Sequence, residues 1–168
     1  MRLGAGTTGG QVKEGIAQLS DGLRALQATG AESARPYFLS LLAEAYGIQG
    51  EPEEGLAVLT EALTRVDTTG ERWYEPELYR LKGALLLQQD SAKQVEAEDC
   101  FQQAITVAQN QQAKSLELRA ATSLARLWQG QGKRGEARQV LGDVYGWFTE
   151  GFDTADLKDA KALLDELA

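Results

Sequence analysis

The feature that most constrains this chain is a recurrence of about 40 residues in the spacing of its small and large apolar side chains. Four small residues lie 40, 42 and 40 residues apart in helix-like stretches: Gly15, Gly55, Ala97 and Ala137. Four residues after each stands a large apolar residue: Leu19, Leu59, Phe101 and Leu141. Self-similarity at a fixed period of roughly 20 to 50 residues is typical of stacked structural repeats. The sequence therefore predicts that one short unit recurs.

A second pattern precedes three of these anchors. The set Leu39, Leu42, Ala43 and Tyr46 recurs as Ala121, Leu124, Ala125 and Trp128, and more loosely as Tyr79, Lys82, Gly83 and Leu86. Both patterns have the spacing of one helix face, so each unit is predicted to be an antiparallel pair of helices. The small residues of the first helices (Ala43, Gly83, Ala125) are expected to face those of the second helices (Gly55, Ala97, Ala137), which lets the two backbones approach closely.

Helical periodicity, glycine stops and prolines in first turns predict eight helices and no strand. The expected ranges are 11–29, 33–49, 52–68, 74–89, 94–110, 113–131, 134–148 and 154–167. Residues 1–9 are small and glycine-rich, and we expect a disordered lead-in there. Residues 10–168 then form a single domain, with the helix at 154–167 as its cap.

Composition excludes several classes of function. The chain has no histidine and a single cysteine, Cys100, which excludes histidine-based catalysis and Cys/His zinc sites. The stretch Gly4-Ala-Gly-Thr-Thr-Gly9 matches a dinucleotide fingerprint only in its letters, because no strand precedes it. No isolated acid stands out as a catalytic group. We expect no enzyme activity, no catalytic residue, no cofactor and no metal.

Charge and hydropathy limit the partners. The net charge is −8, and no dense lysine and arginine stripe is present, which disfavours nucleic acid as a partner. No apolar run approaches the roughly 18 residues of a membrane span, and the N-terminus has no apolar leader region. The sequence therefore predicts a cytoplasmic protein without a membrane partner.

These residues resemble the tetratricopeptide repeat. Leu42-Ala43, Tyr46, Gly55, Leu59 and Ala62 match its pattern in order, as do Leu124-Ala125, Trp128, Ala137 and Leu141, while Ala97, Phe101 and Ala104 match in between. The departures are the period of 40 to 42 residues instead of about 34, a missing closing proline, and Lys82 in a leucine position. The resemblance implies an all-α, right-handed superhelix of antiparallel helix pairs.

Longer phrases carry a narrower resemblance. They are Ala34-Arg-Pro-Tyr-Phe-Leu, Glu77-Leu-Tyr-Arg-Leu-Lys-Gly83, Gln112-Ala-Lys-Ser-Leu-Glu-Leu-Arg-Ala120, and the segment from Tyr145 to Leu157. They are similar to the C-terminal helical-repeat region of large bacterial predicted ATPases, often fused to an adenylate/guanylate cyclase-type domain. The resemblance implies a regulatory or scaffolding segment without the nucleotide motifs of the catalytic parts.

The tetratricopeptide pattern also implies a concave surface lined by the first helix of each pair. Its inward-facing positions fall on Tyr37, Ser40, Glu44, Glu77, Arg80, Arg119, Thr122 and Arg126. A groove that passes from acidic and aromatic to basic could hold a peptide, with arginines gripping a carboxylate. The alternative is a hydrated groove whose salt bridges are local and weak.

We therefore expect a non-catalytic protein–protein interaction module or regulatory scaffold, related to a signalling ATPase/cyclase system. One alternative is a sensor domain that binds a peptide or small effector in the groove. Another is a self-association module, because the apolar stripe Ile16, Leu19, Leu23 and Leu26 has no preceding partner helix and could pair two copies into a homodimer.

Aromatic residues near the C-terminus leave two interpretations open. Tyr145, Trp147, Phe148 and Phe152 form the densest aromatic group in the sequence. They either close the core beneath the last helix or form an exposed docking patch. Trp73 carries a similar ambiguity, with a wedge between two repeats as the simpler reading.

Overall fold

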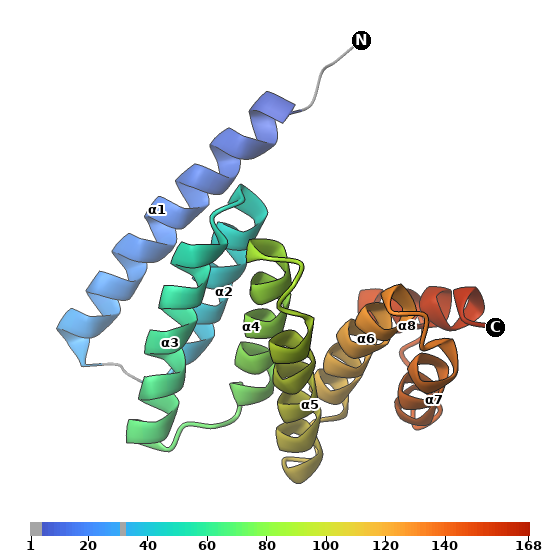
Figure 1. Cartoon of the computed structure of the whole chain (residues 1–168). Helices are drawn as coiled ribbons and strands as arrows, with labels where there is room; N and C mark the ends of the chain where they lie inside the picture. Colours follow the sequence, from blue (N-terminus) through green and yellow to red (C-terminus); the bar gives the residue numbers. More distant parts are fainter. Residues whose placement is uncertain (1–4, 31–32) are drawn as a thin grey trace.

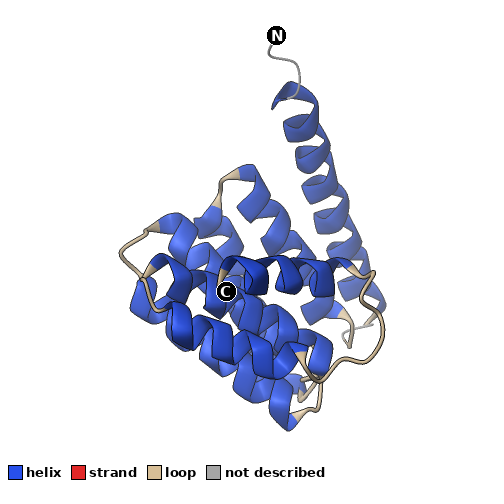
Figure 2. Ribbon diagram, turned by 90° about the vertical axis from the view of Figure 1, so that its right-hand side faces the viewer, coloured by secondary structure: helices blue, strands red, loops and turns tan. Residues whose placement is uncertain are grey.

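The structure is a computed structural model that describes residues 5–30 and 33–168. Within these residues the chain is all-helical, with eight helices and no strand (Figure 2). The helices are α1 (Ala5–Thr29), α2 (Arg35–Gln49), α3 (Pro52–Thr69), α4 (Glu75–Gln89), α5 (Gln94–Asn110), α6 (Lys114–Gly130), α7 (Arg134–Tyr145) and α8 (Ala155–Glu166).

The helices follow one another side by side in chain order, from α1 at one end to α7 and α8 at the other (Figure 1). Each helix contacts its neighbours in sequence, and the even-numbered helices also contact one another: α2 with α4, α4 with α6, and α6 with α8. The odd-numbered helices have no such mutual contacts among the described residues. The even-numbered helices therefore form one continuous layer, and this layer carries the candidate site.

Proline and glycine set most of the helix boundaries. Pro36, Pro52 and Pro76 lie in the first turns of α2, α3 and α4, where a missing N–H leaves no helical hydrogen bond unmade. Gly50 and Gly70 follow α2 and α3 with φ of 84° and 75°, a left-handed conformation that stops a helix and favours glycine. These signals explain why the sequence predicts most boundaries to within one or two residues.

Two boundaries differ from the sequence-based expectation. Helix α1 begins at Ala5 instead of near Gln11, so Ala5–Gly9 belongs to the helix and not to a disordered lead-in. No proline lies in this stretch to block the backbone hydrogen bonds. Residues 1–4, including the start of the dinucleotide-like motif, lie outside the described residues. Helix α7 ends at Tyr145 and not at Phe148, because the chain turns at Gly146.

The close approach of paired helices depends on small residues. A Cβ on Gly55 of α3 would lie 3.0 Å from the carbonyl oxygen of Ala43 in α2. A Cβ on Gly83 of α4 would lie 3.0 Å from the carbonyl oxygen of Ala97 in α5 and 2.6 Å from the Phe101 ring. The two carbonyl contacts are tighter than most Cβ contacts in proteins, and the contact with the Phe101 ring would require that ring to move. The predicted facing of Ala43 with Gly55 and of Gly83 with Ala97 is therefore confirmed.

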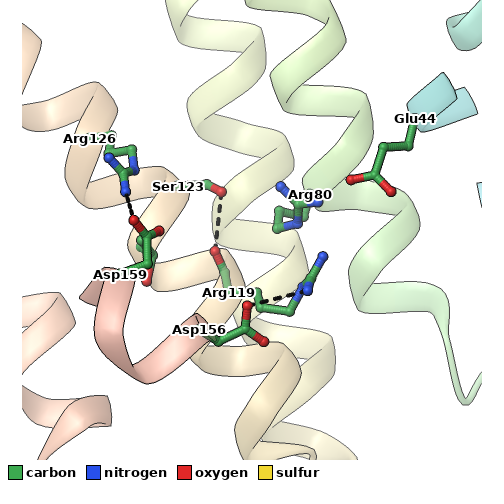
Figure 3. A pocket seen from close by; sticks show the side chains of 8 residues that line it. Glu44, Arg80, Arg119, Ser123, Arg126, Asp156 and Asp159 are labelled. Carbon is green, nitrogen blue, oxygen red and sulfur yellow. Dashed lines mark hydrogen bonds and ion pairs between the residues drawn. The ribbon is translucent and has the colours of Figure 1, made fainter. Parts of the chain in front are cut away.

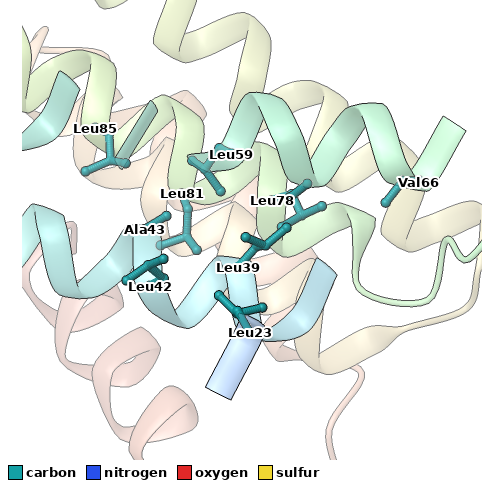
Figure 4. Packing of buried hydrophobic residues seen from close by; sticks show 10 residues of the cluster. Leu23, Leu39, Leu42, Ala43, Leu59, Val66, Leu78, Leu81 and Leu85 are labelled. Atoms are coloured by element: carbon teal, nitrogen blue, oxygen red, sulfur yellow. The ribbon is translucent and has the colours of Figure 1, made fainter. Parts of the chain in front are cut away.

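The core lies between the helix layers along the length of the molecule. Near the N-terminal end, leucines of α1 to α4 converge around Ala43 (Figure 4). A middle cluster centres on Phe101, and a third cluster joins α6, α7 and α8 around Leu141 and Leu163. Because each cluster is built by neighbouring helices, burial is shared between adjacent units instead of being concentrated at one centre.

Three charged residues are buried at corresponding places in the first turns of α2, α4 and α6. They are Arg35, Glu75 and Glu117, each eight residues before the small residue of its helix. Arg35 donates to the carbonyl oxygen of Leu23 at 3.0 Å and to Glu61 at 2.9 Å. Glu75 accepts from Arg72 at 2.9 Å, and Glu117 accepts from Lys114 at 2.7 Å. Each charge thus has its own local partner, as burial of a charge requires.

Among the helices of the described ranges, none combines the length and the apolar character that a bilayer crossing requires.

The Gly83 contact predicts opposite effects for the same substitution at two glycines. Gly83→Ala places a methyl group against the Ala97 carbonyl, so we expect a net loss of roughly 1–2 kcal/mol in unfolding free energy. Gly135→Ala in α7 meets nothing within 4 Å, so we expect a gain of about 0.5 kcal/mol. Urea unfolding followed by circular dichroism measures both. Shifts of the same sign would show that Gly83 is not a close-contact position.

Candidate functional site

A polar pocket of about 340 Å³ lies on the layer of even-numbered helices. Its lining comes from α2 (Glu44), α4 (Arg80), α6 (Arg119, Thr122, Ser123, Arg126) and α8 (Asp156, Asp159). Figure 3 shows Glu44 and Arg126 on opposite sides of the pocket, with Arg80 and Arg119 between them. Four helices that are distant in sequence therefore present three cations and three anions to one concavity.

The pocket rests on Glu77, a buried carboxylate of α4 whose side chain is only 3% exposed. Arg80 from the same helix donates to it through Nε at 2.9 Å and Nη2 at 2.6 Å. Arg119 from α6 donates to it through Nε at 3.1 Å and Nη2 at 2.6 Å. Both guanidinium groups bind bidentately, the strongest geometry for such a pair. Glu77 therefore fixes Arg80 and Arg119 in place and has no free acceptor to offer a ligand.

Burial and neighbouring charges shift the pKa of Glu77 in opposite directions. Burial alone would raise the pKa of Glu77, but the hydrogen bonds and charges of Arg80 and Arg119 outweigh burial and lower the pKa below its ordinary value of 4.5. Burial alone would lower the pKa of Arg119, yet Glu77 and Asp156 raise that pKa overall. Glu77 and Arg119 therefore both stay charged at neutral pH.

The remaining ion pairs of the pocket are more exposed. Arg119 Nη1 lies 3.4 Å from Asp156 Oδ1, and Arg126 pairs with Asp159, with about half of each of these two side chains exposed. Exposed pairs contribute little to stability and exchange readily with other partners. Arg80 Nη1 makes no hydrogen bond within the described part of the chain. The pocket thus keeps both hydrogen-bond donors and acceptors available.

Five of the eight residues expected at the groove line this pocket: Glu44, Arg80, Arg119, Thr122 and Arg126. The other three do not. Glu77 lies beneath the arginines, and Ser40 is buried and donates to the carbonyl oxygen of Tyr37 at 2.6 Å. Tyr37 turns instead toward Trp73 and Tyr74, at ring-centre distances of 5.8 Å and 5.0 Å. Aromatic contacts with the turn before α4 are the physical reason for its placement.

Three lining residues of the pocket were not predicted from the sequence: Ser123, Asp156 and Asp159. The sequence predicts only a capping role for the helix that carries both aspartates. They lie on the side of α8 that faces Arg119 and Arg126, because α8 contacts α6 as well as α7. The sequence places Asp156 and Asp159 on one helix face, but its spacing does not indicate which helix that face meets.

The C-terminal aromatic residues divide between the two interpretations that the sequence left open. Tyr145 and Phe148 pack against the cluster of α6 to α8. Trp147 and Phe152 are 59% and 46% exposed, and the Lys114 ammonium lies 5.9 Å from the Trp147 ring. Trp73 is also exposed and stacks on Tyr37. Neither exposed group adjoins the polar pocket.

Groups with catalytic potential are few. Cys100 is half-buried, and burial raises the pKa of its thiol, which disfavours the reactive thiolate. Within residues 5–30 and 33–168, no group of three or more metal-binding side chains comes together.

Comparison with known proteins gives one informative similarity. No family model matches the chain. An uncharacterized protein of Rhizobium meliloti (strain 1021) is 31% identical over 113 residues, which are 67% of this chain and 11% of that protein. The matched part of this chain thus spans about a tenth of the length of that relative.

The Glu77 network predicts a characteristic dependence of stability on pH. We expect Glu77→Gln to lower the unfolding free energy at pH 7 by roughly 3 kcal/mol, because two guanidinium groups lose their shared counter-charge. The pKa of Glu77 is lower in the folded state than its ordinary value of 4.5. The stability that the ionised carboxylate contributes is therefore fully present well above pH 4.5, and it is lost as the pH falls through the pKa of the folded state. Wild-type stability should therefore drop more steeply below pH 4.5 than that of the variant.

Urea unfolding at pH 3 to 7 measures both slopes. Glu44→Gln removes a carboxylate of the same pocket that is exposed, and serves as the control with an effect below about 0.5 kcal/mol. Parallel pH profiles for wild type and Glu77→Gln would contradict the assigned role of Glu77.

Proposed function

We propose that the chain is a tetratricopeptide-like array of helix pairs with a period of about 40 residues, and that its concave layer binds a peptide segment of a protein partner. The observation that carries this proposal is the convergence of α2, α4, α6 and α8 on one polar pocket. Contacts between successive even-numbered helices support the repeat interpretation, because each pair then relates to the next in the same way.

The chemistry of the lining favours a peptide over a small effector. Sites for small molecules are mostly apolar with a few polar groups. Here all eight lining residues are polar and six of them are charged. Arginines that are held rigidly by Glu77 present fixed N–H donors to a carboxylate, while Glu44, on the side of the pocket opposite Arg126, suits a cationic or N–H group (Figure 3). A peptide offers both kinds of group at regular spacing.

The arrangement favours interaction without catalysis. All three arginines of the pocket are paired with carboxylates, and Glu77 is saturated by hydrogen bonds from two of them. A general acid or base needs a proton that it can exchange near neutral pH. The pKa of Glu77 moves away from that range, which supports a role in shaping the surface.

The biological setting follows from resemblance. The long phrases from Ala34 to Leu157 are similar to the helical-repeat region of large bacterial ATPase/cyclase proteins, and the relative from Rhizobium meliloti is much longer than its matched segment. We place the chain as a scaffold or regulatory module in such a signalling system.

Selection from a random peptide library tests peptide binding at this pocket. Arg126→Glu is the informative variant, because Arg126 is half-exposed and its loss leaves the Glu77 network intact. Arg138→Glu makes the same charge change on α7, outside the pocket, and serves as the control. We expect peptides selected on the wild type to bind Arg126→Glu at least tenfold more weakly (about 1.4 kcal/mol) and to bind the control equally well.

Fluorescence anisotropy with the selected peptides measures these affinities. Failure to enrich any peptide, or equal binding to Arg126→Glu, would reject peptide binding at this pocket.

A further inference from the structure

A second concavity, on the opposite end of the molecule from α8, has a different chemistry. This groove of about 540 Å³ lies along α1 and is lined by Gly15, Gln18, Leu19, Gly22, Leu23 and Leu26, together with Phe38 of α2. Apart from Gln18, every lining residue is apolar or glycine. No residue of the polar pocket takes part in it. We call it the α1 groove.

Several residues of the α1 groove are exposed or partly exposed, whereas their counterparts elsewhere in the chain are buried. Leu19 and Leu26 are partly exposed, but Leu59 and Val66, 40 residues later in α3, are 0% and 1% exposed. Gly22 is exposed, whereas its counterparts Ala62 in α3 and Ala104 in α5 are fully buried. The same positions thus belong to the core in the later units.

The wall of the groove that α2 contributes is also more exposed than the corresponding positions of later helices. Phe38 is partly exposed, whereas its counterparts Leu78 in α4 and Ala120 in α6 are both 0% exposed. Leu78 belongs to the core cluster that α4 shares with α2, the even-numbered helix before it, and α6, the helix of Ala120, contacts α4 in the same way. Helix α2 has no such predecessor within the described residues.

The chain itself therefore provides the template for what covers the α1 groove. Helix α2 packs on both α3 and α4, and the groove has the same position relative to α1 and α2. At the template contact, a Cβ on Gly55 would lie only 3.0 Å from the Ala43 carbonyl oxygen. Gly15 corresponds to Gly55, and a Cβ built on Gly15 meets nothing within 4 Å. The site of closest approach is present in α1, and no helix of the described residues occupies it.

We infer that the α1 groove binds one further amphipathic helix, antiparallel to α1, in the manner in which α2 binds α3 and α4. Its contact face carries a large apolar residue, then a large apolar and a small residue side by side, then an aromatic residue, with the spacing of Leu39, Leu42, Ala43 and Tyr46. The helix belongs to a separate peptide segment and not to α8 of a second copy, because the outward face of α8 carries the exposed ion pair Lys161–Asp165. An apolar groove and a charged face do not complement each other.

The α1 helix of a second copy is the competing occupant. It offers leucines and glycines, but neither the aromatic residue nor the even-numbered type of helix that covers α3, α5 and α7. The inference rests on the helix-pair interpretation proposed above and does not depend on peptide binding at the polar pocket. Arg126→Glu should therefore leave this interaction unchanged, which separates the failure of one proposal from the failure of the other.

The probe is a labelled, helix-stapled peptide with the sequence of residues 35–49 of this chain, added to the protein of residues 1–168. The staple is needed because free helices of this length are marginal in water. Gly15→Leu places a side chain in the groove, where its Cβ meets no atom within 4 Å, and Gly22→Leu does the same seven residues later. Gly10→Leu, on the same helix outside the groove, is the matched control.

Fluorescence anisotropy should show binding to the wild type and to Gly10→Leu, and at least a tenfold loss of affinity for Gly15→Leu and Gly22→Leu. Thermal midpoints of the groove variants should equal or exceed the wild-type value, since leucine replaces glycine inside a helix. A peptide variant with Ala43→Leu should also bind at least tenfold more weakly.

Absence of peptide binding, or binding that Gly15→Leu and Gly22→Leu leave intact, would overturn the inference. Light scattering after size exclusion supplies the other decisive result. A wild-type dimer that Gly15→Leu converts to monomer would assign the groove to α1 of a second copy, and the separate-helix inference would be wrong.

Discussion

The close approach of helices at glycine and alanine is the constraint on which the rest of this structure depends. A Cβ on Gly83 would lie 3.0 Å from the Ala97 carbonyl oxygen and 2.6 Å from the Phe101 ring, so a side chain there would force the two helices or the ring to move. Short separation within a pair lets large residues such as Phe101 and Leu85 reach across to the neighbouring helix. Packing of this kind is directional, because small and large residues alternate along each face. The layer of even-numbered helices, and hence the polar pocket, follows from it.

Electrostatics complete the pocket in a way that hydrophobic packing could not. Glu77 is buried, and its desolvation is offset by two bidentate guanidinium groups from different helices. The pair joins α4 to α6 and holds Arg80 and Arg119 in the lining of the pocket. A buried carboxylate here serves to position cations on a surface. Because the two arginine side chains are already held in place, binding of a ligand loses less side-chain entropy than it would with mobile arginines.

The sequence predicted the helices well because their signals are local. Periodicity, first-turn prolines and Gly50 or Gly70 each act over a few residues, and the facing of Gly55 with Ala43 follows from one repeated spacing. The site was only partly predictable because its geometry depends on contacts far apart in the chain. Tyr37 turns toward Trp73, and Asp156 and Asp159 approach α6, through tertiary packing that no local pattern encodes. Counting along a helix identified the right face, but it could not show that Glu77 lies below that face.

The buried charges in the first turns of α2, α4 and α6 affect which helix can dock at which place during folding. Arg35, Glu75 and Glu117 occupy corresponding places, yet they differ in sign or in partner. Suppose that α2 docked where α4 belongs, as the near-identical spacing of their apolar faces would allow. Arg35 would then be buried away from the Leu23 carbonyl of α1 and from Glu61 of α3, and its charge would lose both partners. For α2, a buried charge whose partners lie on two other helices thus makes a misplaced helix costly, and this cost favours the correct order of assembly among units with similar apolar faces.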